Sequence, residues 1–199
     1  MERLPLKIVL TGGPSGGKST LQTAVMQQIP EAYCAPEMAT ILLSGGFPTP
    51  TEDHPWDENW QRDLQTIIAA GQAALEGTVM RRAIRERKRC VVLDRGLLDG
   101  AAYLPQGMQE LEALTGQTER AMLENYDLVL HLPSSAMHGA YNKVSNPHRF
   151  EEAQAALRIE HNILTAWQNH PNRILLDEPD KHRRIAQGIA AIQSIVNQD

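Results

Sequence analysis

The sequence predicts an α/β fold in which a five-stranded parallel sheet carries helices on both faces. Short aliphatic segments alternate with helical segments along the chain, and this order implies right-handed crossovers between parallel strands. The composition, 42% apolar and 22% charged residues, is that of an ordinary folded protein. Because 199 residues suffice for one well-buried domain and are too few for two ordinary ones, we expect residues 1–199 to form a single domain.

The first half of the chain predicts three strands and three helices. Residues 6–10 are a short aliphatic run before a glycine-rich turn, which is typical of a strand buried on both faces. The other predicted elements are a helix at 18–29, a weak strand at 33–35, a short helix at 38–43, a long helix at 59–87 and a strand at 90–93. The short helix stops at Gly45-Gly46, and three prolines make the stretch up to Trp56 a loop. The apolar stripe of the long helix is Leu64, Ile68, Gly71, Leu75 and Val79.

The second half predicts two more strands, at 128–132 and 174–176. Residues 97–126 predict two short helices separated near Thr115-Gly116. Residues 133–148 have the Ser, Gly, Asn and Pro content of a loop. Two helices follow, and their apolar sides are predicted to be Phe150, Ala153, Leu157, Leu164 and Gln168 in the first and Ile185, Ile189, Ile192 and Val196 in the last.

Charge and cysteine content limit the class of protein. The chain has 19 Lys and Arg against 24 Asp and Glu, a formal net charge of -5, which is the wrong sign for wrapping nucleic acid. The cysteines Cys34 and Cys90 have neither the number nor the spacing of a disulfide framework, so packing is their expected role. No apolar run approaches the roughly 20 residues that span a bilayer, and the N-terminus leads directly into a strand, so we expect a cytoplasmic protein.

The strongest motif is a glycine-rich loop between the first strand and the first helix. It satisfies G-x-x-x-x-G-K-[ST] and consists of Gly12, Gly13, Pro14, Ser15, Gly16, Gly17, Lys18, Ser19 and Thr20. Backbone N–H groups of such a loop can surround a phosphate at the positive end of the helix dipole. We expect Lys18 to reach the β- and γ-phosphates and the Ser19 hydroxyl to help hold a magnesium ion. The alternative is a chance glycine turn before a helix.

Three classes of protein bind triphosphates with such a loop. A signalling GTPase usually carries N-K-x-D, but here Asn142-Lys143 is followed by Val144-Ser145. A ring-forming mechanical ATPase normally adds a helical domain and needs a longer chain. A small-molecule kinase that uses ATP, with GTP as the other candidate, is the most economical interpretation.

A kinase also needs a metal-side carboxylate and an acceptor site. Asp94 and Arg95 end the third strand, where the carboxyl ends of parallel strands form a ligand crevice. Asp94 would hold magnesium through water, and Arg95 would contact the acceptor or the transferred phosphate; alternatively they are a helix cap and its partner. Glu37, after the second strand, would accept the proton of an acceptor hydroxyl, or it is an N-terminal helix carboxylate favoured by the dipole.

Two further segments complete the hypothesis. The segment from about 133 to 150, with Lys143 and Arg149, would be a lid that brings Arg149 to the transferred phosphate and excludes water; alternatively it is an ordinary surface loop. Trp56 and Trp60, with Gln61, Gln65 and Gln72, would wall a pocket for a planar ligand such as a nucleoside, or they are packing anchors and exposed amides. The histidines show no zinc-ligand spacing.

These residues carry a resemblance to a known family. TGGPSGGKSTL, APEMAT, VVLDRGLLDGAAY, YDLVLHL and NPHRFEEA, in this order, resemble the AAA-type P-loop family of the ribosylnicotinamide kinase domain, itself similar to nucleoside and nucleotide kinases. The resemblance implies a three-layer α/β/α sandwich with strand order 2-3-1-4-5. It places Lys18 and Ser19 on nucleotide and magnesium, Asp94 and Arg95 on metal and acceptor, Glu37 on the acceptor side and Arg149 in the lid. Gly96 departs from the serine or bulkier residue of many nucleoside kinases.

The sequence therefore predicts one of two alternative functions, of which the first is favoured. The first is an ATP- and magnesium-dependent phosphotransferase for a small, nucleoside-like metabolite. The second is a regulatory ATP- or GTP-binding protein that hydrolyses slowly and acts through a protein or a lipid headgroup. Because a chain of charge -5 must bind a polyanion, its positive charge should be concentrated at Lys18, Arg95 and Arg149 in a locally basic cleft.

Overall fold

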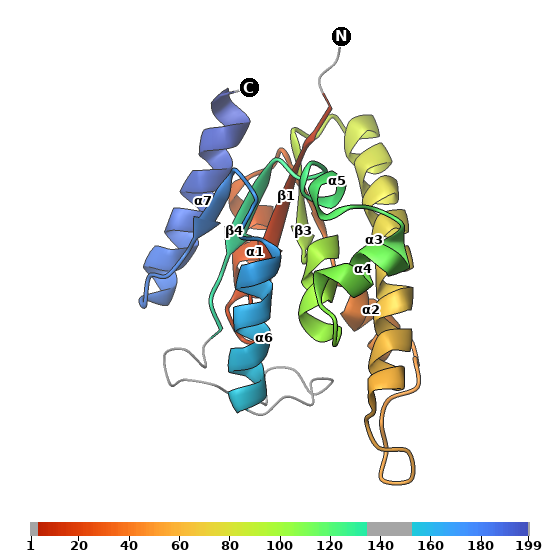
Figure 1. The fold of residues 1–199 in the computed structure, drawn as a ribbon. Coiled ribbons are helices and arrows are strands. Elements are labelled where there is room, and N and C mark those ends of the chain that lie inside the picture. Colours follow the sequence, from red (N-terminus) through yellow and green to blue (C-terminus); the bar gives the residue numbers. More distant parts are fainter. Residues whose placement is uncertain (1–3, 135–152, 199) are drawn as a thin grey trace.

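The computed structural model describes residues 4–134 and 153–198 and contains a parallel sheet between two layers of helices (Figure 1). The strands are β1 (Leu6–Thr11), β2 (Ala32–Ala35), β3 (Cys90–Asp94), β4 (Leu128–His131) and β5 (Arg173–Leu175). The helices are α1 (Lys18–Gln28), α2 (Met38–Ser44), α3 (Glu58–Arg85), the 3-10 helix η1 (Leu97–Tyr103), α4 (Met108–Thr115), α5 (Glu119–Leu123), α6 (Ala153–Ala166) and α7 (Lys181–Gln198). The five predicted strands are confirmed.

All strand pairs are parallel, and the order β2-β3-β1-β4-β5 confirms the predicted topology. The register aligns Leu10 with Asp94, Thr11 with His131 and Ala35 with Leu93. The loops after β1, β2, β3 and β4 therefore leave the sheet at one edge, the lower one in Figure 1. The candidate site residues lie at this edge.

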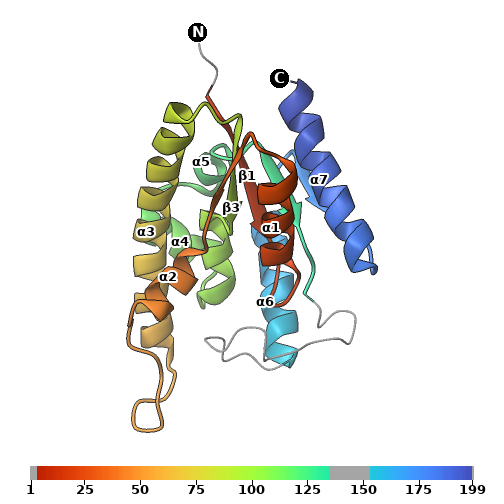
Figure 2. The same cartoon turned by 180° about the vertical axis from the view of Figure 1, so that it is seen from behind.

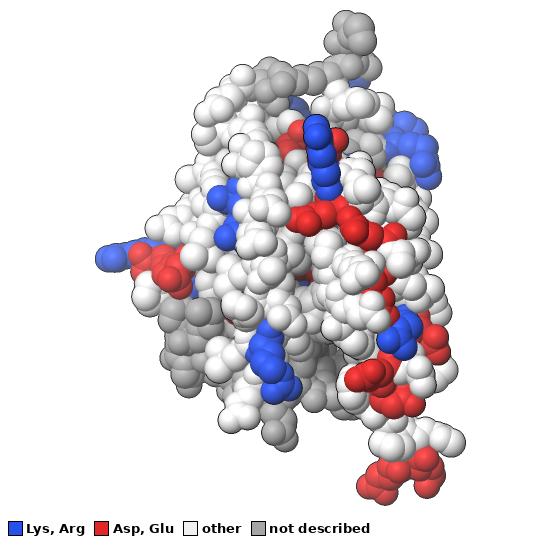
Figure 3. Space-filling model, viewed as in Figure 1, with Lys and Arg blue, Asp and Glu red and all other residues white. Residues whose placement is uncertain are grey.

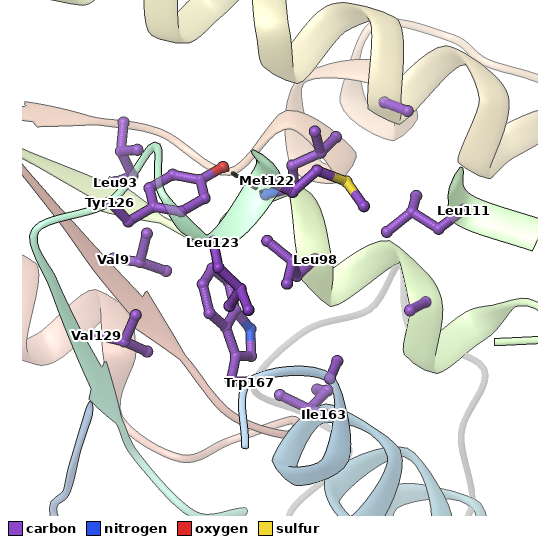
Figure 4. Close-up of a cluster of buried hydrophobic side chains, with 14 of the residues drawn as sticks. Val9, Leu93, Leu98, Leu111, Met122, Leu123, Tyr126, Val129, Ile163 and Trp167 are labelled. Carbon is purple, nitrogen blue, oxygen red and sulfur yellow. Dashed lines mark hydrogen bonds between the residues drawn. The ribbon is translucent and has the colours of Figure 1, made fainter. Parts of the chain in front are cut away.

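Two hydrophobic clusters hold the layers together. Because side chains alternate along a strand, Val9 of β1 points to one face, while Ile8 and Leu10 point to the other. On the first face Val9 packs with side chains from α3, η1, α4, α5 and α6, centred on Trp167 and Tyr126 (Figure 4). On the second face α1 and α7 cover the sheet (Figure 2). In α7 the predicted stripe is confirmed, with Ile189, Ile192 and Val196 buried.

The buried sides of two helices differ from the prediction. In α6 and the residue after it, Ala156, Glu160, Ile163 and Trp167 are buried, whereas the predicted Leu157 is 42% exposed and Gln168 is exposed. In α3 the buried side includes Gln65, Gln72 and Glu76 besides Leu64 and Val79. Hydrophobic periodicity placed Leu64 and Val79 correctly, but it missed the polar residues on both buried sides. Among these, Gln72, Glu76 and Glu160 are hydrogen-bonded inside the protein.

The segment after β3 also differs from the prediction of two helices. Residues 97–123 contain η1, α4 and α5, and Gly107, with φ 58°, separates η1 from α4. The predicted break near Gly116 is confirmed, since Gly116 ends α4 in the left-handed conformation. Among the described helices, none combines the length and apolar character required to cross a membrane.

Candidate functional site

The glycine-rich loop connects β1 to α1, as predicted. Gly17 precedes α1 with φ 97°, and Ser15 adopts φ 59°. A Cβ at Gly16 would lie 2.5 Å from the carbonyl oxygen of Leu132, and one at Gly12 would overlap that oxygen. These two glycines are therefore required by the close approach of the loop to the chain that leaves β4, in addition to any approach of a ligand.

Lys18 lies against this loop. Its side chain begins α1, the residue is 8% exposed, and its ammonium group donates to the carbonyl oxygens of Gly12 at 2.8 Å and Gly13 at 2.9 Å. Ser19, the next residue, is exposed on the same helix turn. The loop thus presents a cation and a hydroxyl at the N-terminal end of a helix, where anions are favoured.

Glu37 and Arg95 form a buried ion pair at the same sheet edge. Arg95 Nε donates to Glu37 Oε1 at 2.6 Å, and the two side chains are only 9% and 11% exposed. Burial lowers the pKa of the Arg95 guanidinium, but Tyr103, Glu37 and the aspartates beside it outweigh this effect and hold the pKa well above its usual value. Arg95 therefore stays charged inside the protein.

Arg95 lines a cleft, and both of its terminal nitrogens are buried. Within residues 4–134 and 153–198 neither of them has a hydrogen-bond partner, although one lies 4.0 Å from Asp99 Oδ1. The guanidinium also lies 5.8 Å from the centre of the Tyr103 ring. These nitrogens are donors available to a bound group, because a buried guanidinium is costly to leave without acceptors.

The cleft has a volume of about 820 Å³ and lies between α2, α3, η1 and α6. Trp56, Trp60, Gln61, Gln65 and Gln72 all line it, as predicted. Gln65 is 4% exposed, and its amide makes no hydrogen bond to a described residue, so this amide is available to a ligand. An apolar wall with a few polar groups suits a planar, hydrogen-bonding molecule.

The other aromatic and amide groups already have partners. Trp60 Nε1 donates to the carbonyl of Pro48 at 2.6 Å, and Trp56 Nε1 donates to Gln61 Oε1 at 3.2 Å. These tryptophans therefore both anchor the loop before α3 and line the cleft. Gln72 donates to Glu76 Oε1 at 3.0 Å and to the carbonyl of Arg95 at 3.2 Å.

The described residues that line the cleft are balanced in charge. The charged residues among them are Arg95, Arg158, Glu37 and Asp99. The charge of Arg95, which was expected to make the cleft basic, is offset by its ion pair with Glu37. The expected basic cleft at Lys18, Arg95 and Arg149 stays a prediction, because Arg149 lies outside the described residues. Figure 3 shows acidic side chains over α4 and on the loop before α3. Lys143 and Arg149, and the predicted lid from residue 135 onward, lie outside the described residues.

Sequence reasoning missed Asp99, which joins three elements behind Arg95. Its Oδ1 accepts from the hydroxyl of Thr11 and from Trp167 Nε1 at 3.2 Å, and its Oδ2 accepts from the N–H of Gly96 at 3.0 Å. Asp99 takes the place of the acidic residue of a capping box, but the capping residue is Gly96 instead of Ser or Thr, so the motif is not recognisable in the sequence.

Arg95 adopts a left-handed backbone conformation, with φ 69°. A hydrogen-bonded group of three side chains, which the sequence did not predict, supports this turn. Gln72 of α3 holds the Arg95 carbonyl, and Glu76 accepts from Gln72 and from the Tyr126 hydroxyl at 2.9 Å. Tyr126 in turn accepts the N–H of Leu97, the dashed line in Figure 4. A non-glycine residue in this left-handed conformation is strained, and such strain persists where surrounding contacts impose it.

Glu160 is a third missed residue, on the buried side of α6. Its Oε2 accepts from the N–H of Gly13 at 2.7 Å and of Ser134 at 2.8 Å, and its Oε1 lies 2.6 Å from His131 Nε2. Burial raises the pKa of Glu160, but the hydrogen bond and charge of His131, with the two backbone N–H groups, outweigh burial and lower it. Glu160 is therefore a buried carboxylate in contact with the glycine-rich loop.

The fold and the glycine-rich loop are those of a P-loop protein with an α/β/α architecture. The chain belongs to the AAA domain family, whose model matches residues 7–184. No curated protein sequence matches the chain.

Solved structures show the same fold. The NadR protein in complex with NR has a TM-score of 0.71 and 17% identity, covering 98% of this chain and 52% of that chain. The NadR protein in complex with NAD and AMP-PNP has a TM-score of 0.69 and 17% identity, and the match covers 98% of this chain and 50% of that chain. The deoxyadenosine kinase from M. mycoides, with the products dCMP and dCDP, has a TM-score of 0.60 and 13% identity, and the match covers 98% of this chain and 100% of that chain. This chain thus spans about half the length of the NadR chains.

Gly96 has a structural explanation. A Cβ at this position would lie 2.8 Å from the Trp167 ring and 3.1 Å from Val9, and the backbone is extended, with φ -118°. We therefore expect Gly96→Ser to reduce the free energy of unfolding by about 1–3 kcal/mol through overpacking, measured by urea denaturation.

The matched control is Gly77→Ala in the middle of α3. There a Cβ meets only the end of the Arg81 side chain, at 3.3 Å. We expect this variant to be as stable as the wild type or more stable by up to about 1 kcal/mol. An unchanged stability for Gly96→Ser would show that Trp167 repacks without cost.

Proposed function

We propose that this protein is an ATP- and magnesium-dependent phosphotransferase for a small, nucleoside-like acceptor. The observation that carries the proposal is the buried Glu37–Arg95 pair, which lines an 820 Å³ cleft at the sheet edge that also holds the glycine-rich loop. A nucleotide-binding loop alone needs no such cleft. The solved structures with nucleotide ligands support the nucleotide part of the proposal.

In the proposed reaction Glu37 accepts the proton of an acceptor hydroxyl. The hydroxyl oxygen forms a bond to the γ-phosphorus, and the bond from that phosphorus to the β,γ-bridging oxygen breaks, so the electron pair leaves with ADP. Lys18 and loop N–H groups stabilise the charge on the phosphates, and Arg95 holds the acceptor or the migrating phosphoryl group. Arg149 would add a further cation, and this role remains a prediction.

The residues present suit a magnesium ion. Among the described residues no group of three or more His, Cys, Asp or Glu could hold a metal by itself. Magnesium keeps several waters and is usually bound through one or two protein oxygens and the substrate phosphates. The Ser19 hydroxyl and the Asp94 carboxylate, the latter directly or through water, are the proposed protein ligands. The ion would neutralise phosphate charge during transfer.

The direct test is a screen for γ-phosphate transfer from ATP and GTP to nucleosides, nucleotides, vitamins and sugars. Transfer to one class of acceptor is the expected result. Phosphate release with no acceptor preference would instead favour the regulatory nucleotide-binding protein.

Glu37→Gln is expected to lower kcat by about 10²–10⁴-fold with a small change in KM for the acceptor, because it removes the general base and keeps the side-chain shape. The measurement is steady-state kinetics with the acceptor found in the screen. Glu124→Gln is the matched control, since Glu124 accepts from Arg120 Nε at 2.7 Å on the surface, 63% exposed. A kcat for Glu37→Gln within twofold of the control would exclude Glu37 as the base.

A further inference from the structure

The contact between Glu160 and the glycine-rich loop goes beyond the proposed function. Glu160 is 1% exposed and His131 is fully buried, and they come from α6 and from the end of β4. A buried carboxylate is costly unless it is paired and hydrogen-bonded, and apolar residues of similar volume often serve stability equally well. Its value to the protein therefore lies in what it orients.

Glu160 fixes one particular peptide of the loop. The N–H of Gly13 donates to Glu160 Oε2 at 2.7 Å, while the carbonyl of Gly13 accepts from Lys18 Nζ at 2.9 Å. Both polar backbone groups of Gly13 are thus held, the N–H by the Glu160 carboxylate and the carbonyl by the Lys18 ammonium group. A Cβ at Gly13 would lie 2.5 Å from Glu160 Oε2, so only glycine permits this approach.

Pro14, the next residue of the loop, is held by Ser134, which also contacts Glu160. Ser134 donates its N–H to Glu160 Oε2 at 2.8 Å and its hydroxyl to the carbonyl of Pro14 at 2.8 Å. Glu160 and Ser134 together tie two consecutive loop residues to α6 and to the chain after β4. The carbonyl direction at Gly13 and Pro14 sets the orientation of the neighbouring loop N–H groups.

The same helix also forms a wall of the cleft. Leu157, Arg158 and His161 of α6 line the cleft, and Glu160 leaves the helix toward the loop. The helix therefore fixes the position of the loop relative to the cleft.

We propose that Glu160, oriented by His131, is a positioning residue that presets the glycine-rich loop for the phosphates of the nucleotide. This inference rests on the proposed function. A residue with only a structural role would change stability alone. A positioning residue changes the affinity for phosphate-bearing ligands selectively, because the phosphates are the groups that contact the loop.

The experiment compares Glu160→Leu and Glu160→Gln with the wild type in the full chain. Isothermal titration calorimetry gives Kd for ATP with magnesium and for adenosine, and thermal unfolding without ligand gives stability. Glu160→Leu leaves two buried N–H donors without an acceptor, so we expect Kd for ATP to rise about tenfold or more, with Kd for adenosine within twofold of the wild type. Glu160→Gln retains an acceptor oxygen and is expected to recover most of the ATP affinity.

Glu112→Gln is the matched control, since Glu112 Oε1 accepts the N–H of Glu119 at 2.6 Å away from the loop. If Glu160→Leu does not fold, His131→Asn provides the test, because it removes the group that orients Glu160. We then expect faster amide hydrogen exchange at Gly13 and Ser134 and weaker ATP binding in His131→Asn. Unchanged ATP affinity and unchanged amide exchange in folded Glu160→Leu or, where that variant does not fold, in His131→Asn would overturn the inference and leave the proposed function standing. Failure of the wild type to bind ATP would overturn both.

Discussion

Lys18→Ala is expected to reduce phosphoryl transfer by about 10²–10³-fold or more and to abolish the rise in unfolding temperature caused by ATP with magnesium. The ammonium group donates to the carbonyls of Gly12 and Gly13 and lies at the start of α1, where the proposed phosphates would bind. Alanine removes this charge and preserves the helix, because alanine has the highest helix propensity. Transfer rates and thermal unfolding with and without ATP measure the effect.

Lys88→Ala is the matched control for Lys18→Ala. Lys88 Nζ also donates to a backbone carbonyl, that of Pro30 at 2.7 Å, but on the exposed surface. We expect Lys88→Ala to retain both the transfer rate and the ATP-dependent shift. Loss of ligand-free stability by Lys18→Ala of more than about 1–2 kcal/mol would show that its two hydrogen bonds support the fold as well as the site.

The strands could be predicted because the central strands are buried on both faces, whereas their order was expected only from the family resemblance. Ile8, Val9 and Leu10 are fully buried, and an aliphatic run of this kind followed by a turn is typical of a strand buried on both faces. The glycine-rich loop was equally clear, since its spacing is specific and its strand–helix context is as expected. Glu37 and Arg95 line one cleft, as expected, because parallel strands end at one edge of the sheet. Asp94, which was expected in the same cleft, is buried at the end of β3 and does not line it.

The supporting groups could not be predicted in the same way. Glu76 and Glu160 lie on buried helix faces, where an apolar pattern assigns polar residues to the solvent side. Gln72 was expected in the cleft wall, but its hydrogen bond to the Arg95 carbonyl was not. Their partners are distant in the sequence: Glu160 contacts Gly13, 147 positions away. Only the three-dimensional arrangement shows that each is paired. The left-handed conformation of Arg95 is likewise imposed by tertiary contacts and leaves no local signal.

Arg95→Lys is expected to reduce transfer by about 10²-fold even though it preserves the positive charge. Arg95 lines the cleft and uses Nε for Glu37, while its two terminal nitrogens have no hydrogen-bond partner among the described residues, so the proposal gives them to a ligand. A lysine has one nitrogen and no planar fork, so it must abandon one of these contacts. Steady-state kinetics should show a lower kcat together with a higher KM for the acceptor.

Arg120→Lys is the matched control, because the Arg120–Glu124 pair has the same Nε-to-carboxylate contact on the surface, with Arg120 87% exposed. We expect no measurable kinetic change there, since exposed ion pairs contribute little. The described charges that line the cleft balance only when Arg95 is counted, since Arg158 alone stands against Glu37 and Asp99. Wild-type kinetics in Arg95→Lys would mean that the site needs only the charge of Arg95, and the two terminal nitrogens would lose their proposed role at the acceptor.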